Sequence, residues 1–325
     1  MGRSQLTGVA GKQFAPLAVV SRNGVDESVH FGALVALNAD GSIAFSVGDP
    51  EVEIFPRSST KPFQALAMVR HGLTLDAEHL ALVCASHNGE QIHQRIAAEI
   101  LASVGLDENA LANTHDYPLH VDSAHQAIRD GKAKSSLQMN CSGKHAGMLA
   151  TCVINGWSTA DYLAQDHPLQ QAITHTLAEV TAMTPPAIGV DGCGAPAHVV
   201  GLRHLAQGLR SIATGDAGAS GREVFTAMSN YPHLIGGTGR HVTGIVSAIS
   251  GMCAKDGAES VYVAAMEDGR AIALKMSDGS GRAIATVLVA ALAKLGVDVS
   301  SVPGYVDELI LGHGQPVGRV RAIEM

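Results

Sequence analysis

The sequence predicts an α/β (α+β) fold in which a sheet is flanked by helices, with residues 1–325 forming a single domain. Short apolar runs bounded by Gly, Asn and Asp lie near both ends of the chain and are typical of strands. Between them, apolar residues recur at helical spacing. No fixed repeat, low-complexity tract or linker divides the chain. Terminal strands around a helical centre favour a layered domain in which both ends join one sheet.

Three strands are expected near the amino end. They cover residues 17–20, 32–38 and 43–47. The sequence Asn-Ala-Asp-Gly between the last two is typical of a hairpin turn. Near the carboxyl end, residues 261–266 and 271–276 form two further strand-like runs joined by Glu-Asp-Gly-Arg, a second hairpin signal.

Helices are expected through the centre. After Pro62 the apolar residues form one helical face that ends before Gly72, and Asp76 is the expected cap of the next helix. The same spacing predicts helices over residues 90–104, 143–155, 168–183, 196–212, 221–230 and 281–295.

Composition excludes several classes of protein. With 325 residues, of which 46% are hydrophobic and 16% charged, the chain can bury a large core. Its net charge of −8 and lack of a basic run argue against a nucleic-acid partner. The five cysteines follow no disulfide or zinc-finger spacing, and no apolar stretch has the length of a signal peptide or membrane span. We therefore expect a cytoplasmic protein with reduced thiols and no membrane partner.

The most suggestive pattern is Ser58-x-x-Lys61 followed by Pro62. Because proline is tolerated near a helix start, both residues are placed in a first turn, where positions i and i+3 share a face. A neutral lysine there can take the proton of a serine hydroxyl. The pattern fixes only two positions, so a chance occurrence is the more frequent explanation when it stands alone.

Other motifs are equally open when taken singly. Ser86, His87 and Asn88 end an apolar run and predict either a site or a capped element. Asn140, Cys141, Ser142, Lys144 and His145 surround a glycine at a helix start, which suits either an anion-binding turn or a plain cap. Asp191 and Cys193 lie in one glycine-rich loop, and Gly237 and Arg240 lie in another. Lys275 ends an apolar strand, where it is either an edge lysine or a second amine of a site.

Taken together and in order, six motifs resemble the Rhizobium-type L-asparaginase (asparaginase II-like) family. They read RSSTKPFQ, CASHNGE, NCSGKHAGM, DGCGAP, GGTGR and DGRAIALKMSDGSGRA, between Arg57 and Ala283, and the flanking sequence is similar as well. The resemblance implies a serine β-lactamase/glutaminase-like fold with a mixed sheet, a homodimer, and hydrolysis of L-asparagine to L-aspartate and ammonia.

The resemblance also implies roles for individual residues. Two Ser-Lys pairs, Ser58 with Lys61 and Ser86 with Lys275, are the expected catalytic groups; Ser58 is the preferred nucleophile with Lys61 as its base, and the reverse assignment stays open. Zinc is implied as a cofactor on Cys141, Lys144 and Cys193. Substrate contacts are expected from Arg57, His87, Asn140, His145, Asp191, Gly237 and Arg240.

Two alternatives remain beside this interpretation. A glutaminase or another small-amide amidohydrolase is the nearest, because one methylene is worth only about 1–3 kcal/mol of discrimination. A non-catalytic protein that binds a small molecule or zinc would keep the glycine loops but would not need the serines and lysines. The chain lacks the Ser-Asp-Asn and Lys-Thr-Gly motifs of β-lactamases, which disfavours antibiotic hydrolysis.

Overall fold

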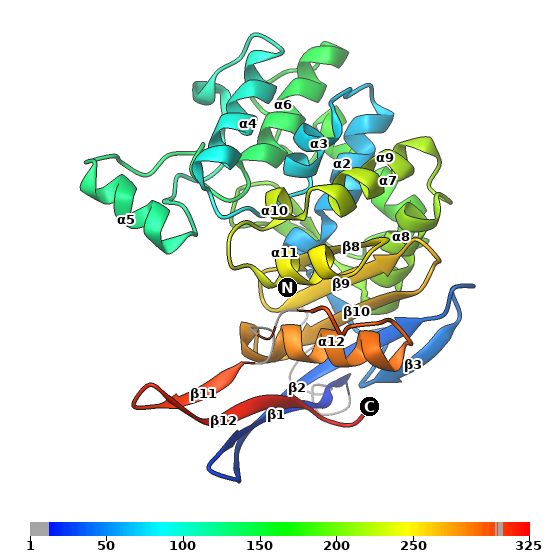
Figure 1. The fold of residues 1–325 in the computed structure, drawn as a ribbon. Helices are drawn as coiled ribbons and strands as arrows, with labels where there is room; N and C mark the ends of the chain where they lie inside the picture. Colours follow the sequence, from blue (N-terminus) through cyan, green and yellow to red (C-terminus); the bar gives the residue numbers. More distant parts are fainter. Residues whose placement is uncertain (1–12, 303, 305–307) are drawn as a thin grey trace, which may run out of the picture.

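The computed structural model describes residues 13–302, 304 and 308–325 (Figure 1). The strands are β1 (Ala15–Arg22), β2 (Val25–Leu37), β3 (Ile43–Val47), β4 (Glu53–Ile54), β5 (Ile188–Val190), β6 (Pro196–His198), β7 (Val200–Gly201), β8 (Met252–Gly257), β9 (Val261–Met266), β10 (Ala271–Met276), β11 (Leu309–Gly312) and β12 (Gln315–Ala322). The α-helices are α2 (Lys61–Arg70), α3 (Ala77–Val83), α4 (Gln91–Ala102), α5 (Val121–Arg129), α6 (Ser142–Asn155), α7 (Pro168–Thr181), α8 (Leu202–Thr214), α9 (Ala219–Asn230), α10 (Pro232–Ile235), α11 (His241–Ala248) and α12 (Ile284–Lys294). Three 3₁₀ helices are η1 (Arg57–Thr60), η2 (Glu108–Ala110) and η3 (Gly281–Ala283).

One large sheet joins both ends of the chain, as expected. In the described residues it has eight strands in the order β11-β12-β1-β2-β10-β9-β8, with β3 also paired to β2. The terminal strands are direct neighbours, with Val20 opposite Val320. The pairings recorded along this sheet are all antiparallel, so the expectation of a mixed sheet is wrong. Hairpins supply most neighbours, and the two pairings between distant parts of the chain, β1 with β12 and β2 with β10, are antiparallel as well.

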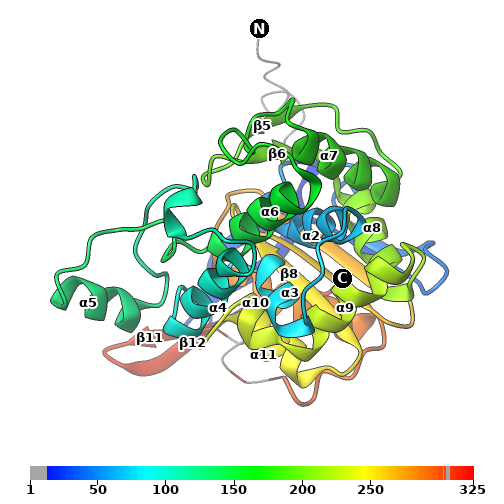
Figure 2. The same ribbon diagram turned by 90° about the horizontal axis from the view of Figure 1, so that it is seen from above.

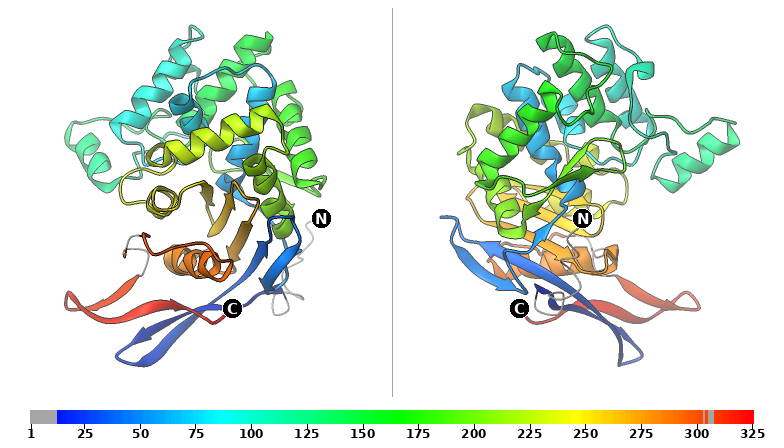
Figure 3. Two further views of the ribbon diagram at one scale, coloured as in Figure 1. Left: turned by 45° about the vertical axis from the view of Figure 1, so that its right-hand side comes forward. Right: turned by 180° about the vertical axis from the view of Figure 1, so that it is seen from behind.

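Helices cover the sheet on both faces, which confirms the predicted α/β layering. α8 packs against β2, β9 and β10, and α12 packs against β9, β10 and β12. Figure 3 shows α12 and α8 on opposite sides of the strands, and Figure 1 shows the other helices gathered beyond one edge of the sheet. The sheet and the helical part therefore meet along η1 and β8.

The helix α6 approaches α3 unusually closely. A Cβ atom on Gly143 would lie 2.5 Å from the Leu82 carbonyl oxygen, and one on Gly147 would lie 2.8 Å from the Val83 side chain. Both positions therefore require glycine. The glycines that suggested an anion-binding turn serve instead to bring the start of α6 against the end of α3.

Most predicted elements form, with one clear error. Residues 196–212 were expected to be one helix, whereas 196–198 and 200–201 are strands and α8 begins at Leu202. Pro196 and His198 pair with Val190 and Ile188, and Val200 pairs with Ile54. The β-branched Val199 and Val200, followed by Gly201, suit an extended chain better than a helix.

The segment carrying α5 stands away from the body in Figures 1 and 2. We call residues 116–135 the α5 arm; its ends are joined by an isolated bridge between Asp116 and Ser135. In the described ranges, no helix is both long and apolar enough to cross a membrane.

Candidate active site

Lys61 lies at the centre of the candidate site. It begins α2 directly after η1, with Pro62 in the first helical turn, as the motif predicted. The side chain is 2% exposed. Its Nζ lies 2.5 Å from the carbonyl oxygen of Ala85, 2.9 Å from Ser86 Oγ and 3.1 Å from Cys141 Sγ. One amine therefore joins the start of α2, the segment after α3 and the start of α6.

The two serines differ in their surroundings. Ser86 is 5% exposed and is bonded to Lys61. Ser58 is half-buried in η1, and its hydroxyl has no recorded hydrogen bond among the described residues. The serine that is hydrogen-bonded to Lys61 is therefore Ser86, which comes from a different segment of the chain. Ser58 is the hydroxyl more open to an incoming molecule.

Lys275 and Ser86, the second expected pair, have different hydrogen-bond partners in the structure. The Lys275 side chain is half-buried at the end of β10, and its amine donates to the carbonyl of Glu259. Burial lowers the pKa of Lys275, and nearby Glu259 and Asp278 oppose that effect. The strand carries Lys275 toward the turn after β8 instead of toward α2.

A different lysine, Lys255, occupies the sheet edge beside η1. It is fully buried on β8, and its carbonyl accepts a hydrogen bond from Ser59 Oγ at 3.2 Å. Its Nζ donates to the carbonyl and to Oδ1 of Asp256, at 2.7 and 2.6 Å. Burial lowers the pKa of Lys255 to about 8; Asp256 opposes the shift and the Lys61 charge adds to it. The sequence signal that was overlooked is a lysine inside the apolar run from Met252.

The predicted zinc ligands come together. Lys144 Nζ lies 3.1 Å from Cys193 Sγ, and Cys193 packs in one buried cluster with Cys141. Burial lowers the pKa of Lys144, but the two sulfurs outweigh it and raise that pKa to about 12. The hydrogen bond with Cys141 lowers the pKa of Cys193, and the Lys144 charge adds to this effect.

This donor set fits a soft metal ion. Two thiols and an amine converge out of water, and Nε2 of His145 is buried close by without a hydrogen-bond partner. Among the described residues no group of three His, Cys, Asp or Glu side chains has metal-binding spacing, because the third donor here is a lysine. A thiolate pair with nitrogen donors is a chemistry that zinc accepts.

Arg57 and Asp191 bind each other at the mouth of this centre. The guanidinium Nε and a terminal nitrogen of Arg57 lie 2.8 and 2.7 Å from Asp191 Oδ1. The same oxygen accepts the backbone N–H of Gly192 at 2.7 Å. Arg57 has φ +53°, an uncommon backbone conformation for a residue with a side chain. The pair fixes the loop before Cys193 against η1.

His87 and Asn140 lie in the wall of the site. Nδ1 of His87 accepts the N–H of Gly89 at 3.0 Å, so Nε2 carries the proton and donates to Ser142 Oγ at 3.0 Å. Burial and the neighbouring His93 lower the pKa of His87 well below its usual value. The backbone N–H of His87 donates to the carbonyl of Asn140. Both residues therefore bind neighbouring protein groups and hold residues 86–90, the Ser86 segment, in place.

His145 is also buried in the wall, with its Nδ1 2.8 Å from the hydroxyl of Tyr162. Burial lowers the pKa of His145 to about 4, and the charge of Lys144 adds to this effect. The ring is therefore neutral at pH 7.

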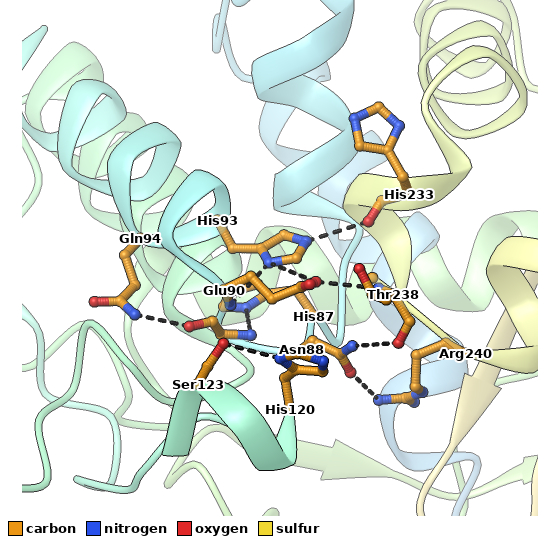
Figure 4. Close-up of polar contacts among 12 residues, drawn as sticks. His87, Asn88, Glu90, His93, Gln94, His120, Ser123, His233, Thr238 and Arg240 are labelled. Carbon is orange, nitrogen blue, oxygen red and sulfur yellow. Dashed lines mark hydrogen bonds and ion pairs between the residues drawn. The ribbon is translucent and has the colours of Figure 1, made fainter. Parts of the chain in front are cut away.

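Gly237 and Arg240 lie in one loop, and Figure 4 shows Thr238 and Arg240 of this loop bonded to Asn88. Asn88 donates from Nδ2 to the carbonyl of Thr238 at 2.9 Å, and Glu90 Oε2 accepts the N–H of Thr238 at 3.1 Å. Gly237 has φ +116° and passes so close to Glu90 and Asn88 that a side chain has no room. Arg240 lies 2.5 Å from Asp256 Oδ2, which links this loop to Lys255.

Sequence comparison gives a single family. The model for L-asparaginase II matches residues 18–322, which is nearly the whole chain. No curated protein sequence is significantly similar to this chain.

Several solved structures show a distant likeness. A β-lactamase from Mycobacterium bovis is 12% identical, with 81% of this chain and 94% of that chain covered at a TM-score of 0.48. A Bacillus glutaminase in 4.3 M NaCl is 12% identical, with 90% and 94% covered at a TM-score of 0.47. Mglu in its native form is 12% identical over 81% of this chain at a TM-score of 0.44, and the chain spans only 63% of its length.

Proposed function

Because the chain belongs to the L-asparaginase II family, we propose that it hydrolyses L-asparagine to L-aspartate and ammonia. The family match supports amidohydrolase activity in general. The observation that best supports a serine-lysine mechanism is the buried Lys61 amine, 2.9 Å from Ser86 Oγ and three residues from Ser58. The homodimer implied by the resemblance and the cytoplasmic location expected from composition stay predictions.

In the proposed reaction Ser58 is the nucleophile, because its hydroxyl is the more exposed and has no competing hydrogen bond. Its oxygen attacks the side-chain carboxamide carbon of asparagine while its proton passes to neutral Lys61. Ammonia leaves with a proton that returns from Lys61, directly or through the Ser86 hydroxyl. Water then attacks the aspartyl ester and releases aspartate, with Lys61 again taking and returning the proton.

Lys255 takes the second-amine role that the sequence had given to Lys275. It is buried beside η1 and held by Asp256, which in turn is bound by Arg240. Lys255 therefore supplies a second buried amine on the β8 side of η1. Arg57 and Asp191 lie at the mouth of the site, where their opposite charges suit the α-carboxylate and α-ammonium groups of an amino acid.

Zinc is proposed as a resident ion held by Cys141, Lys144 and Cys193. When bound, zinc would supply a positive charge that polarises or orients groups beside it. The residues themselves fix the loop of Cys193 next to the start of α6, and this holds Cys141 within reach of Lys61. We expect Cys193→Ala to reduce the zinc content of the purified protein, measured by metal analysis. An unchanged content would remove Cys193 as a ligand.

The first experiment is ammonia release from the purified, zinc-loaded protein with L-asparagine and, separately, with L-glutamine. Release from asparagine with little from glutamine supports the proposal. Release mainly from glutamine would make the protein a glutaminase, because the same serine-lysine chemistry acts on either amide. No release from either, with folded protein, would favour the non-catalytic alternative.

The acylated serine is identified by mass spectrometry of protein quenched during turnover. An aspartyl ester on the peptide containing Ser58 supports our assignment, and Ser58→Ala should then lose both the adduct and turnover. An adduct on Ser86 would exchange the roles of the two serines. Ser59→Ala is a useful control because Ser59 is adjacent but bonds to the β8 backbone.

A further inference from the structure

A cavity of about 270 Å³ with mostly polar lining residues lies between α4 and the α5 arm, and none of these residues has been given a catalytic or zinc-binding role. Its lining includes two carboxylates, from Asp122 and Asp130, and one amine, from Lys132. The carboxamides of Gln91, Gln94 and Gln138 line it as well. This is a concave space in which opposite charges and amide groups converge, and neither the sequence motifs nor the proposed function accounts for it.

Several of these groups are available to a ligand. Asp122 and Lys132 are exposed, and no ion pair is recorded for either among the described residues. The other acidic group of the lining, Asp130, already accepts from Gln126 at 2.7 Å. Gln138 is 7% exposed; its Nε2 donates to a backbone carbonyl, and its buried Oε1 has no hydrogen-bond partner. Because that oxygen has almost no accessible surface, Gln138 forms part of the cavity wall rather than a contact for the ligand.

We propose that this cavity is a second binding site for a free α-amino acid. Asp122 matches the α-ammonium group and Lys132 matches the α-carboxylate, each as a charge-assisted contact. The carboxamides of Gln91 and Gln94 offer both donors and acceptors to a polar side chain. Among the described residues, Asp122 and Lys132 are the charged groups of the lining with no recorded side-chain partner; a zwitterion matches both, whereas a simple anion or cation matches only one.

The cavity wall is joined to the segment that carries Ser86. Gln94 donates from Nε2 to the carbonyl of Gly89 at 2.7 Å, and the backbone N–H of His120 donates to the carbonyl of Asn88 at 3.0 Å. Figure 4 shows Gln94 on α4 and His120 at the start of α5 on either side of this segment. An amino acid bound between the two helices would therefore restrict the position of residues 86–90, and this regulatory consequence rests on the proposed function.

Binding of L-aspartate, which the proposed reaction does not consume, tests the site by calorimetry. We expect the double variant Asp122→Asn/Lys132→Met to bind one aspartate fewer per chain than the wild type. Lys134→Met is the matched control, because it removes a lysine from the same arm that does not line the cavity. The control should keep the wild-type stoichiometry. Equal stoichiometry and affinity in the double variant and the control would overturn the inference.

Hydrogen exchange provides a second readout. Aspartate should slow exchange of the amides of residues 86–90 more in the wild type and in Lys134→Met than in the double variant. Equal slowing in all three proteins would disprove the link between the cavity and this segment. Neither measurement requires turnover. A protein that releases no ammonia would contradict the proposed function, but the loss of one bound aspartate in the double variant would still support the second site.

Discussion

Lys61 and Lys275 both lie in family motifs of the sequence, but their surroundings in the structure differ. The Lys61 amine is buried and meets Ala85, Ser86 and Cys141, which come from two other segments of the chain. The Lys275 amine is half-buried and meets the backbone carbonyl of Glu259. A lysine in a family motif therefore becomes a candidate base only where separate elements converge on it. The convergence at Lys61 depends on α6 packing closely on α3.

The largest expected effect separates these two lysines. Lys61→Met should lower kcat/KM for asparagine by about 10³-fold, because a positioned general base contributes roughly 10²- to 10⁴-fold. Lys275→Met should leave kcat/KM nearly unchanged. Ammonia release at several substrate concentrations measures both, with circular dichroism to establish that each variant is folded. Equal losses in the two folded variants would place Lys275 in the site and remove the contrast.

A second prediction concerns the contact between Asn88 and the 236–240 loop. Asn88→Ala should lower the free energy of unfolding by about 0.5–1.5 kcal/mol, because the carbonyl of Thr238 loses its donor in a part-buried clamp. Asn38→Ala is the control, since the Asn38 amide bonds to Ser42 in an exposed turn. Urea unfolding followed by fluorescence or circular dichroism measures both variants. Similar small losses would mean that the clamp on the 236–240 loop contributes little.

The smallest expected effect is a pH dependence from Lys255. Burial lowers the pKa of Lys255 to about 8 in the folded protein, below its value in the unfolded chain. Between these two pKa values the unfolded state binds more protons than the folded state, so stability rises with pH. The cost of burying the charged amine is therefore fully present below about pH 8 and declines above it. Relative to Lys255→Met, the wild type should gain about 1 kcal/mol of stability between pH 8 and pH 9.

Urea unfolding at both pH values measures this difference. Lys275→Met serves as the comparison, because the half-buried Lys275 should give a smaller change with pH. A stability difference between wild type and Lys255→Met that does not vary with pH would mean that Lys255 titrates normally.

Much of the local structure could be predicted from sequence because short-range forces decide it. The hairpin at Asn38–Gly41 and the turn at Glu267–Arg270 follow from residues that adopt positive φ, and Asp76 caps α3 through the N–H of His79 as expected. The error at Pro196–Gly201 arose because those residues pair with strands elsewhere in the chain. Spacing along the chain does not report such pairing.

By itself, the sequence determined the α/β class, most of the helices and the residues that mark the family. Only the tertiary structure decided that Lys61 meets Ser86, that Lys255 is buried beside η1, and that Lys144 meets Cys193. The physical reason is the range of the interactions. Helices and turns are selected by neighbours a few residues apart, whereas the partner of a buried amine is selected by which distant segments pack around it.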